Sequence, residues 1–276
     1  MTAFDVELVG KIGSMALINR EYNDIDYNII ARISRELKPG CMWVTSGATE
    51  IGRLDYLHRV GNELWGDYND IKTDYSAQGQ AILMETYRRF VDSRFSLRQF
   101  LVEHQHFNDD MKREHLRAAL MRCPKQGAIP IINYNDPVCS EENRKMEIQA
   151  LRSAHAKVVE CIDNDETAGQ IACLVKPRYL LLLTSVDGIY RDVKDNSTLI
   201  PEITADNGDE LTQKIDYYMN YCDGASRPGA NGAAAKLEYV KEPAKLGTTV
   251  YIANSRYGIR EVLEGRAPST KIYLKK

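Results

Sequence analysis

The chain has 276 residues, of which 43% are hydrophobic and 27% charged, an ordinary composition for one folded α/β domain. Its formal net charge is −3 at pH 7 and its basic residues are scattered, so no nucleic-acid-binding surface is indicated. The longest apolar runs, such as residues 179–183, are far shorter than the roughly 20 residues of a membrane-spanning helix, and we expect no membrane association.

Strand-like and helix-like segments alternate along the chain. The strand-like segments are short, apolar and bounded by turn residues: 5–9, 42–44, 129–132, 179–184 and 248–253. The segments with helical periodicity or a helix-like composition are 24–37, 78–90, 111–121, 141–159, 163–175, 208–220 and one that begins near 233. Residues 62–76 are polar and weakly periodic and indicate an excursion over the surface. This alternation predicts an α/β fold with a mostly parallel sheet.

The cysteines and histidines form no pattern typical of a metal site or a disulfide framework. None of the six cysteines forms a C-x-x-C pair, and the five histidines form no H-E-x-x-H motif. His104 and His106 would share a face only in a strand, and such a pair is more often incidental than a metal site. Free cysteines within apolar runs, together with the lack of a secretion signal, lead us to expect a cytoplasmic protein.

Four of the predicted strands are followed directly by Gly, Asn, Asp or Ser residues. In an open parallel sheet the loops at the carboxyl ends of strands form the ligand crevice, so these loops are expected to share one site. Glycines there allow backbone N–H groups to approach an anion. Lys11 and Lys236 would place point charges on phosphate oxygens, and Asp165 and Asp136 could orient those lysines or a substrate amine.

Each of these features also has an ordinary structural interpretation. Lys11 could be a surface lysine at a strand end, and residues 229–236 could be a loop that enters an Ala-rich helix. Asp163-Asn164-Asp165 is a good helix N-cap whatever else it does. No P-loop signature, dinucleotide fingerprint or protein-kinase motif set is present, so the order of the segments carries the functional inference.

In that order, the segments resemble the amino acid kinase superfamily, and within it the glutamate 5-kinase (gamma-glutamyl kinase) branch. The resemblance runs from about residue 6 to residue 273 and rests on residues 10–14 (GKIGS), 45–48 (TSGA), 132–136 (INYND), 163–165 (DND), 183–190 (LTSVDGIY) and 229–236 (GANGAAAK). It implies a three-layer αβα sandwich with a mostly parallel central sheet. The RNA-modification-type C-terminal (PUA) domain of many bacterial members is not expected, because the sequence ends where the kinase domain would end.

The resemblance also assigns roles to single residues. Lys11 and Lys236 would stabilise charge on the transferred phosphoryl group, and Asp165 would hold both lysines. The implied acceptor-binding residues are Ser46, Gly47, Ala48, Asn135, Asp136 and Asn164. The implied nucleotide-binding residues are Lys11, Gly13, Ser14, Thr184, Ser185, Asp187, Gly188, Gly229, Gly232 and Lys236. ATP would be the phosphoryl donor, with Mg²⁺ held mainly through its phosphates and no protein metal site.

One departure leaves the acceptor open. Between Asp136 and Asp163 lie 26 residues, more than the glutamate 5-kinase branch leads us to expect, and they fall where the amino-acid-binding loop would lie. A surface or oligomer-contact helix is the simpler interpretation of this segment. L-glutamate is the simplest acceptor; N-acetylglutamate, aspartate, carbamate, a phosphate such as UMP, or a catalytically silent domain remain alternatives.

The resemblance further predicts the organisation of the whole chain. Residues 1–276 would form a single kinase domain, with an acceptor-binding lobe at about 1–165 and a nucleotide-binding lobe at about 166–276. A symmetric homo-oligomer is expected from the family and from the general frequency of such assemblies.

Overall fold

The computed structural model describes residues 5–139, 141–154, 158–222 and 232–275. Within them, eight strands form one sheet: β1 (Leu8–Ile12), β4 (Cys41–Val44), β5 (Ser96–Val102), β6 (Ala128–Tyr134), β7 (Tyr179–Thr184), β8 (Glu202–Ala205), β9 (Thr249–Asn254) and β10 (Ser269–Leu274). A small second sheet pairs β2 (Ile18–Asn19) with β3 (Asp24–Ile25).

The helices in the described residues have the following bounds: α1 (Tyr27–Glu36), α2 (Ala48–Val60), α3 (Tyr68–Phe90), α4 (Gln105–Asn108), α5 (Asp110–Lys125), α6 (Glu141–Ala154), α7 (Asn164–Val175), α8 (Gly208–Met219), α9 (Gly232–Lys245) and α10 (Ile259–Leu263). Two short 3-10 helices, η1 (Ser14–Ala16) and η2 (Asn196–Thr198), complete the described elements.

The strand order of the main sheet is β5-β6-β4-β1-β7-β9-β10-β8. Every neighbouring pair from β5 to β9 is parallel, and the direction reverses only between β9 and β10. The carboxyl ends of β1, β4, β6, β7 and β9 therefore meet at one edge of the sheet. Strands that follow β1 in the chain lie on both sides of it, β4 and β6 on one side and β7 and β9 on the other. Ligands of open α/β sheets usually bind in the crevice at such a point.

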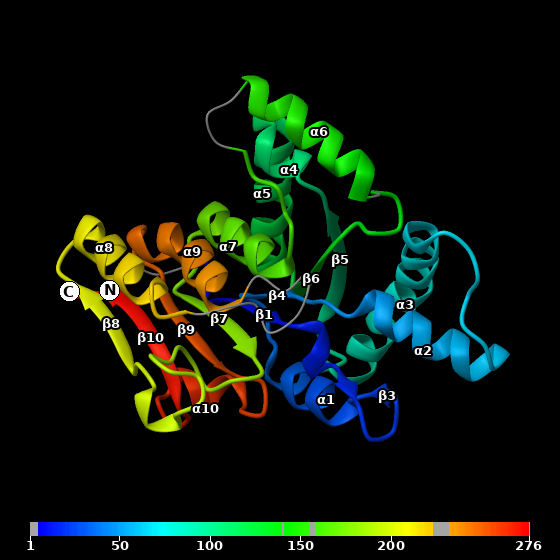
Figure 1. The fold of residues 1–276 in the computed structure, drawn as a ribbon, viewed down its shortest axis with the longest axis horizontal. Coiled ribbons are helices and arrows are strands. Elements are labelled where there is room, and N and C mark those ends of the chain that lie inside the picture. Colours follow the sequence, from blue (N-terminus) through cyan, green and yellow to red (C-terminus); the bar gives the residue numbers. More distant parts are fainter. Residues whose placement is uncertain (1–4, 140, 155–157, 223–231, 276) are drawn as a thin grey trace.

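Helices cover both faces of this sheet, as Figure 1 shows. Successive side chains of a strand point to opposite faces. In β7, Leu180 and Leu182 thus join the core beneath α5, α7, α8 and α9, whereas Leu181 and Leu183 join the core beneath α1, α2, α3 and α10. The predicted three-layer αβα architecture with a mostly parallel sheet is confirmed.

The strand expected at 5–9 lies three residues later, at Leu8–Ile12, and two helix starts were also predicted wrongly. Residues 68–76, expected in a surface excursion, form the first turns of α3, which begins early because the Asp67 carboxylate accepts hydrogen bonds from two backbone N–H groups of its first turn. The helix expected from residue 24 begins at Tyr27, where Asp26 caps it, and residues 24–25 pair in β3 instead. Capping by a side-chain oxygen decides both boundaries.

Glycines fix how α2 meets α3 beside the crevice. An added Cβ on Gly52 would overlap the carbonyl oxygen of Tyr75, and one on Gly79 would overlap that of Ala48. The two helices can cross at this distance only without those side chains. This close crossing fixes the start of α2, and with it the loop that follows β4, at the carboxyl edge of the sheet.

Candidate active site

Lys11, Asp165 and Lys236 meet at the carboxyl edge beside β1. The Lys11 Nζ lies 2.7 Å from one carboxylate oxygen of Asp165, and the Lys236 Nζ lies 2.8 Å from the other. The Asp165 side chain is only 6% exposed, and those of Lys11 and Lys236 are 9% and 21% exposed. One buried carboxylate thus bridges two ammonium groups from elements far apart in the sequence.

The charges of this cluster explain the protonation state of Asp165. Burial by itself raises the pKa of a carboxyl group, but the two lysines outweigh burial and hold the pKa of Asp165 below its usual value. The carboxylate therefore stays ionised at neutral pH. The cluster carries two positive charges and one negative charge, and its net charge of +1 suits an anionic ligand.

Local sequence explains why the three side chains converge. Lys11 lies in β1, and Asp165 lies in the first turn of α7, whose N-cap residue Asp163 accepts hydrogen bonds from the N–H groups of Asp165 and Glu166. Lys236 lies in α9, which packs against α7. The two helices approach closely at Gly169, because an added Cβ there would overlap the carbonyl oxygen of Tyr239.

The backbone beside Lys11 is uncrowded. Among the described residues outside its own neighbours in the chain, a Cβ added to Gly13 would meet only the Lys11 Nζ, at 3.6 Å. Ser14 follows as the first residue of η1, and Gly232 begins α9 with a φ of 59° that favours glycine. The ammonium groups and the open glycine backbone fit a nucleotide phosphate group.

A chain of amide hydrogen bonds lines the β4–β6 side of the crevice. Asn164 donates to the Ser46 hydroxyl at 2.8 Å and to the Asn133 amide oxygen at 3.1 Å, and Asn133 donates to Gln80 at 2.9 Å. Within the described residues, the Gln80 amide nitrogen and the Asn164 amide oxygen are buried without a partner. Gly47 precedes α2 with a φ of 94°. A donor and an acceptor without partners mark this side as a place for a polar ligand.

Asn135 and Asp136, which follow β6, do not take part in this chain of hydrogen bonds. The Asn135 amide donates to Glu103 at 2.6 Å, and no hydrogen bond joins it to Ser46 or Asn164. Asp136 is half-buried, and burial raises its pKa against the opposing influence of Lys72 and Arg144. Sequence reasoning missed Asn133 and Gln80; the signal for Asn133 was a polar residue at the end of an otherwise buried strand.

Residues expected to bind the nucleotide lie at the end of β7, which is joined there to the end of β9. The backbone carbonyls of Thr184 and Ser185 accept hydrogen bonds from Ser255 and Asn254, which joins the two strand ends. Asp187 receives two hydrogen bonds from Arg256, at 2.8 and 2.9 Å, a pairing that sequence reasoning did not anticipate.

Packing accounts for one glycine of the expected nucleotide site, Gly188, and another lies outside the described residues. An added Cβ on Gly188 would lie 2.5 Å from the Thr270 hydroxyl oxygen, so packing against β10 already requires a glycine there. Gly229 lies outside the described residues. Within those residues, no group of three or more His, Cys, Asp or Glu side chains could hold a metal ion.

None of the helices that the structure describes is both long and apolar enough to cross a membrane. His104 is the N-cap residue of α4, and His106 lies within that helix. They form no metal-binding group with other described residues.

A parallel sheet with two lysines at its carboxyl edge is typical of α/β proteins that bind an anionic ligand. The sequence matches the amino acid kinase family over residues 8–254. The chain therefore belongs to the amino acid kinase family, and this membership supports activity as an ATP-dependent phosphotransferase.

Among curated proteins, the chain is similar to glutamate 5-kinases. It is 28% identical over 259 residues to that of Streptococcus suis (strain 05ZYH33), which covers 90% of this chain and 64% of the relative. It is also 28% identical over 274 residues to that of Alkaliphilus metalliredigens (strain QYMF), which covers 96% of this chain and 94% of the relative.

Solved structures are similar to this chain in fold, at lower sequence identity. Carbamate kinase from Giardia lamblia bound to AMP-PNP matches with a TM-score of 0.59 and 13% identity, over the whole of both chains. Isopentenyl phosphate kinase of T. acidophilum matches with a TM-score of 0.54 and 15% identity, over 97% of this chain and 100% of that one. At these identities the likeness establishes the fold alone.

Proposed function

We propose that the chain transfers the γ-phosphoryl group of ATP to a carboxylate of a small acid, most simply the side-chain carboxylate of L-glutamate. The observation that carries the proposal is the buried Asp165 carboxylate with one lysine on each oxygen. The similarity to glutamate 5-kinases over 90% or more of the chain supports the choice of acceptor. The product would be L-glutamyl 5-phosphate, and the reaction would be the opening step of proline synthesis.

The proposed chemistry needs alignment and charge neutralisation rather than a general base. An acceptor carboxylate oxygen forms a bond to the γ-phosphorus, and the bond from that phosphorus to the β–γ bridging oxygen breaks, so ADP leaves with the electron pair. No proton moves, because a carboxylate is already an adequate nucleophile. Lys11 and Lys236 would neutralise the charge that spreads over the transferred group, while Asp165 keeps both ammonium groups in place.

The remaining residues have proposed roles on either side of this cluster. Gly13, Ser14 and Gly232 would offer backbone N–H groups to the phosphates, and Mg²⁺ bound to those phosphates would neutralise further charge. The acceptor would lie toward β4 and β6, among the following residues: Ser46, Gly47, Ala48, Asn135, Asp136 and Asn164. The nucleoside would lie toward β7 and β9, beside Thr184, Ser185 and Asp187.

The test is ADP release from ATP·Mg²⁺ with a panel of acids, compared between the wild type and Lys236→Met. We expect turnover with L-glutamate, and a loss of about 100- to 1,000-fold in kcat for the variant, as when other preorganised charge contacts are removed. Lys241→Met is the matched control, because Lys241 lies on the same helix, is 17% exposed and pairs with Asp216 and Glu238 instead. Turnover with no acid, or equal losses in both variants, would overturn the proposal.

A further inference from the structure

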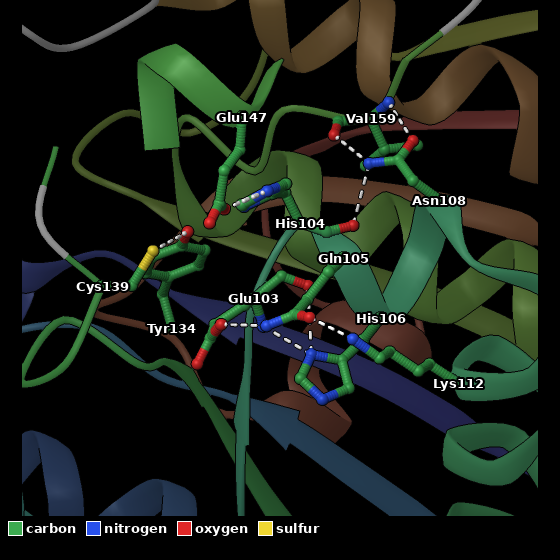
Figure 2. A network of polar contacts seen from close by, with 10 residues as sticks. All are labelled: Glu103, His104, Gln105, His106, Asn108, Lys112, Tyr134, Cys139, Glu147 and Val159. Carbon is green, nitrogen blue, oxygen red and sulfur yellow. Dashed lines mark hydrogen bonds and ion pairs between the residues drawn. The ribbon is translucent and has the colours of Figure 1, made fainter. Parts of the chain in front are cut away.

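Helix α6 occupies the long segment between Asp136 and Asp163, and it is fastened beside the acceptor side of the crevice. Glu147 of α6 lies 2.9 Å from Nε2 of His104, which is 1% exposed and precedes α4 (Figure 2). Ile148 on the next position of the helix is 6% exposed. In Figure 1, α6 lies beyond α4 and α5, away from the central sheet. These contacts give α6 a defined place rather than that of a free surface helix.

Arg144 extends from α6 across two segments that carry candidate acceptor residues. Its guanidinium donates a hydrogen bond to the carbonyl of Cys161 at 3.1 Å, three residues before Asn164. The same group lies over the Tyr134 ring, 5.4 Å from its centroid, at the end of β6. Arg144 is half-buried, and the described residues offer its other guanidinium nitrogens no hydrogen-bond partner. A guanidinium with spare donors suits a carboxylate.

A second cation, Lys72 of α3, acts electrostatically on the same part of the site. Lys72 is half-buried, and no described residue forms an ion pair or hydrogen bond with it. Lys72 and Arg144 both act electrostatically on Asp136, and both oppose the rise in its pKa that burial causes. Asp136 in turn accepts no hydrogen bond from a described residue. Asp136 is thus within electrostatic reach of two cations that have no ionic partner among the described residues.

We propose that Arg144, assisted by Lys72, binds a second carboxylate of the acceptor, one that is not phosphorylated, while Asp136 binds its ammonium group. This inference rests on the proposed phosphotransferase function and narrows its substrate class to α-amino dicarboxylic acids. The sheet edge would direct the reacting carboxylate toward Lys11 and Lys236, and α6 would supply the charge that recognises the opposite end. The long segment between Asp136 and Asp163 would then be a specificity element.

The experiment compares three acids in the wild type and in Arg144→Gln. L-glutamate has both carboxylates and the ammonium group, 4-aminobutyrate lacks the α-carboxylate, and glutarate lacks the ammonium group. Loss of a charge-assisted hydrogen bond corresponds to a rise of about tenfold to 100-fold in the KM for L-glutamate, with kcat and the KM for ATP nearly unchanged. The kcat/KM for 4-aminobutyrate should stay the same, so the preference for L-glutamate over it should fall by the same factor.

Two further variants separate binding from structural support. Arg152→Gln is the matched control on α6, because Arg152 is exposed and pairs with Glu160, and it should leave all three acids unaffected. Glu147→Gln loosens the attachment of α6 to His104. If Arg144 only anchored α6, then Arg144→Gln and Glu147→Gln would both lower kcat/KM for L-glutamate and 4-aminobutyrate alike, and the inference would be wrong.

The outcomes also distinguish the inference from the proposed function. If another acid with a second carboxylate is the best acceptor and Arg144→Gln removes that preference, the inference holds and the glutamate assignment fails. If the best acceptor has only one acidic group, or Arg144→Gln leaves the preference intact, the inference fails and the kinase function stands. Turnover with none of the acids overturns both.

Discussion

Replacement of Asp165 by asparagine tests the lysine–carboxylate cluster through stability as well as activity. The substitution keeps the shape of the side chain but leaves the ammonium groups of Lys11 and Lys236 without a counter-charge. The side chains of these lysines are only 9% and 21% exposed. Breaking a buried ion pair costs about 3–5 kcal/mol. Because Lys236 retains some contact with water and asparagine keeps one acceptor oxygen, we expect a loss of about 3 kcal/mol, at the low end of that range.

The pH dependence of this loss has a definite sign. The pKa of Asp165 is lower in the folded chain than its usual value, so the carboxylate contributes stability above the pKa of the unfolded chain. That contribution is lost as pH falls through the folded pKa. The difference in unfolding free energy between the wild type and Asp165→Asn should therefore be largest above about pH 4 and shrink in more acidic solution.

Urea unfolding at a series of pH values measures this difference, and ADP release measures activity in parallel. Asp163→Asn is the matched control, because asparagine caps a helix as well as aspartate does and the substitution removes the same charge two residues away. We expect that control to change the unfolding free energy by less than about 1 kcal/mol. Equal losses for the two variants, or a difference that does not depend on pH, would refute the reasoning.

Three other substitutions test the packing that supports the site. Gly52→Ala places a Cβ on the carbonyl oxygen of Tyr75, so we expect a loss of about 2 kcal/mol or more in unfolding free energy and a lower kcat, measured by urea unfolding and ADP release. Tyr87→Phe leaves the buried Trp43 indole N–H without its acceptor at 3.0 Å and should cost about 1–3 kcal/mol in the same unfolding assay. Burial lowers the pKa of His104, so the neutral imidazole contributes its full share of stability above the pKa of the unfolded chain, and this share declines as pH falls toward the folded pKa. The unfolding free energy of His104→Gln, measured in urea, should lack this part of the acid sensitivity.

The sequence indicated the central strands and the site more clearly than the edges of the sheet. The buried strand at 179–184 and the helix that begins after Asp163 lie where they were predicted. Strand β5 was missed because it lies at the edge of the sheet and mixes Arg98 and Gln99 with apolar residues, which removes the pattern of a buried strand. Edge strands take part of their identity from pairing, and a single sequence does not show pairing.

Two features of the site depend on contacts that sequence order cannot reveal. The ion pairs of Asp165 join residues more than 70 positions apart, and only the docking of α9 onto α7 at Gly169 brings Lys236 within reach. The hydrogen bond from Asn133 to Gln80 likewise depends on how α3 lies against β6. Asn135, which the resemblance assigned to the acceptor site, donates its amide to Glu103.

Hydroxamate trapping tests the central claim most directly, because hydroxylamine reacts with an acyl phosphate and not with ADP or inorganic phosphate. The wild type is incubated with ATP·Mg²⁺, L-glutamate and hydroxylamine, beside Lys236→Met. The proposed function requires glutamyl hydroxamate to form in step with ADP in the wild type and to fall with it by about 100-fold or more in the variant. Release of ADP without hydroxamate, or hydroxamate formation that does not depend on Lys236, would contradict it.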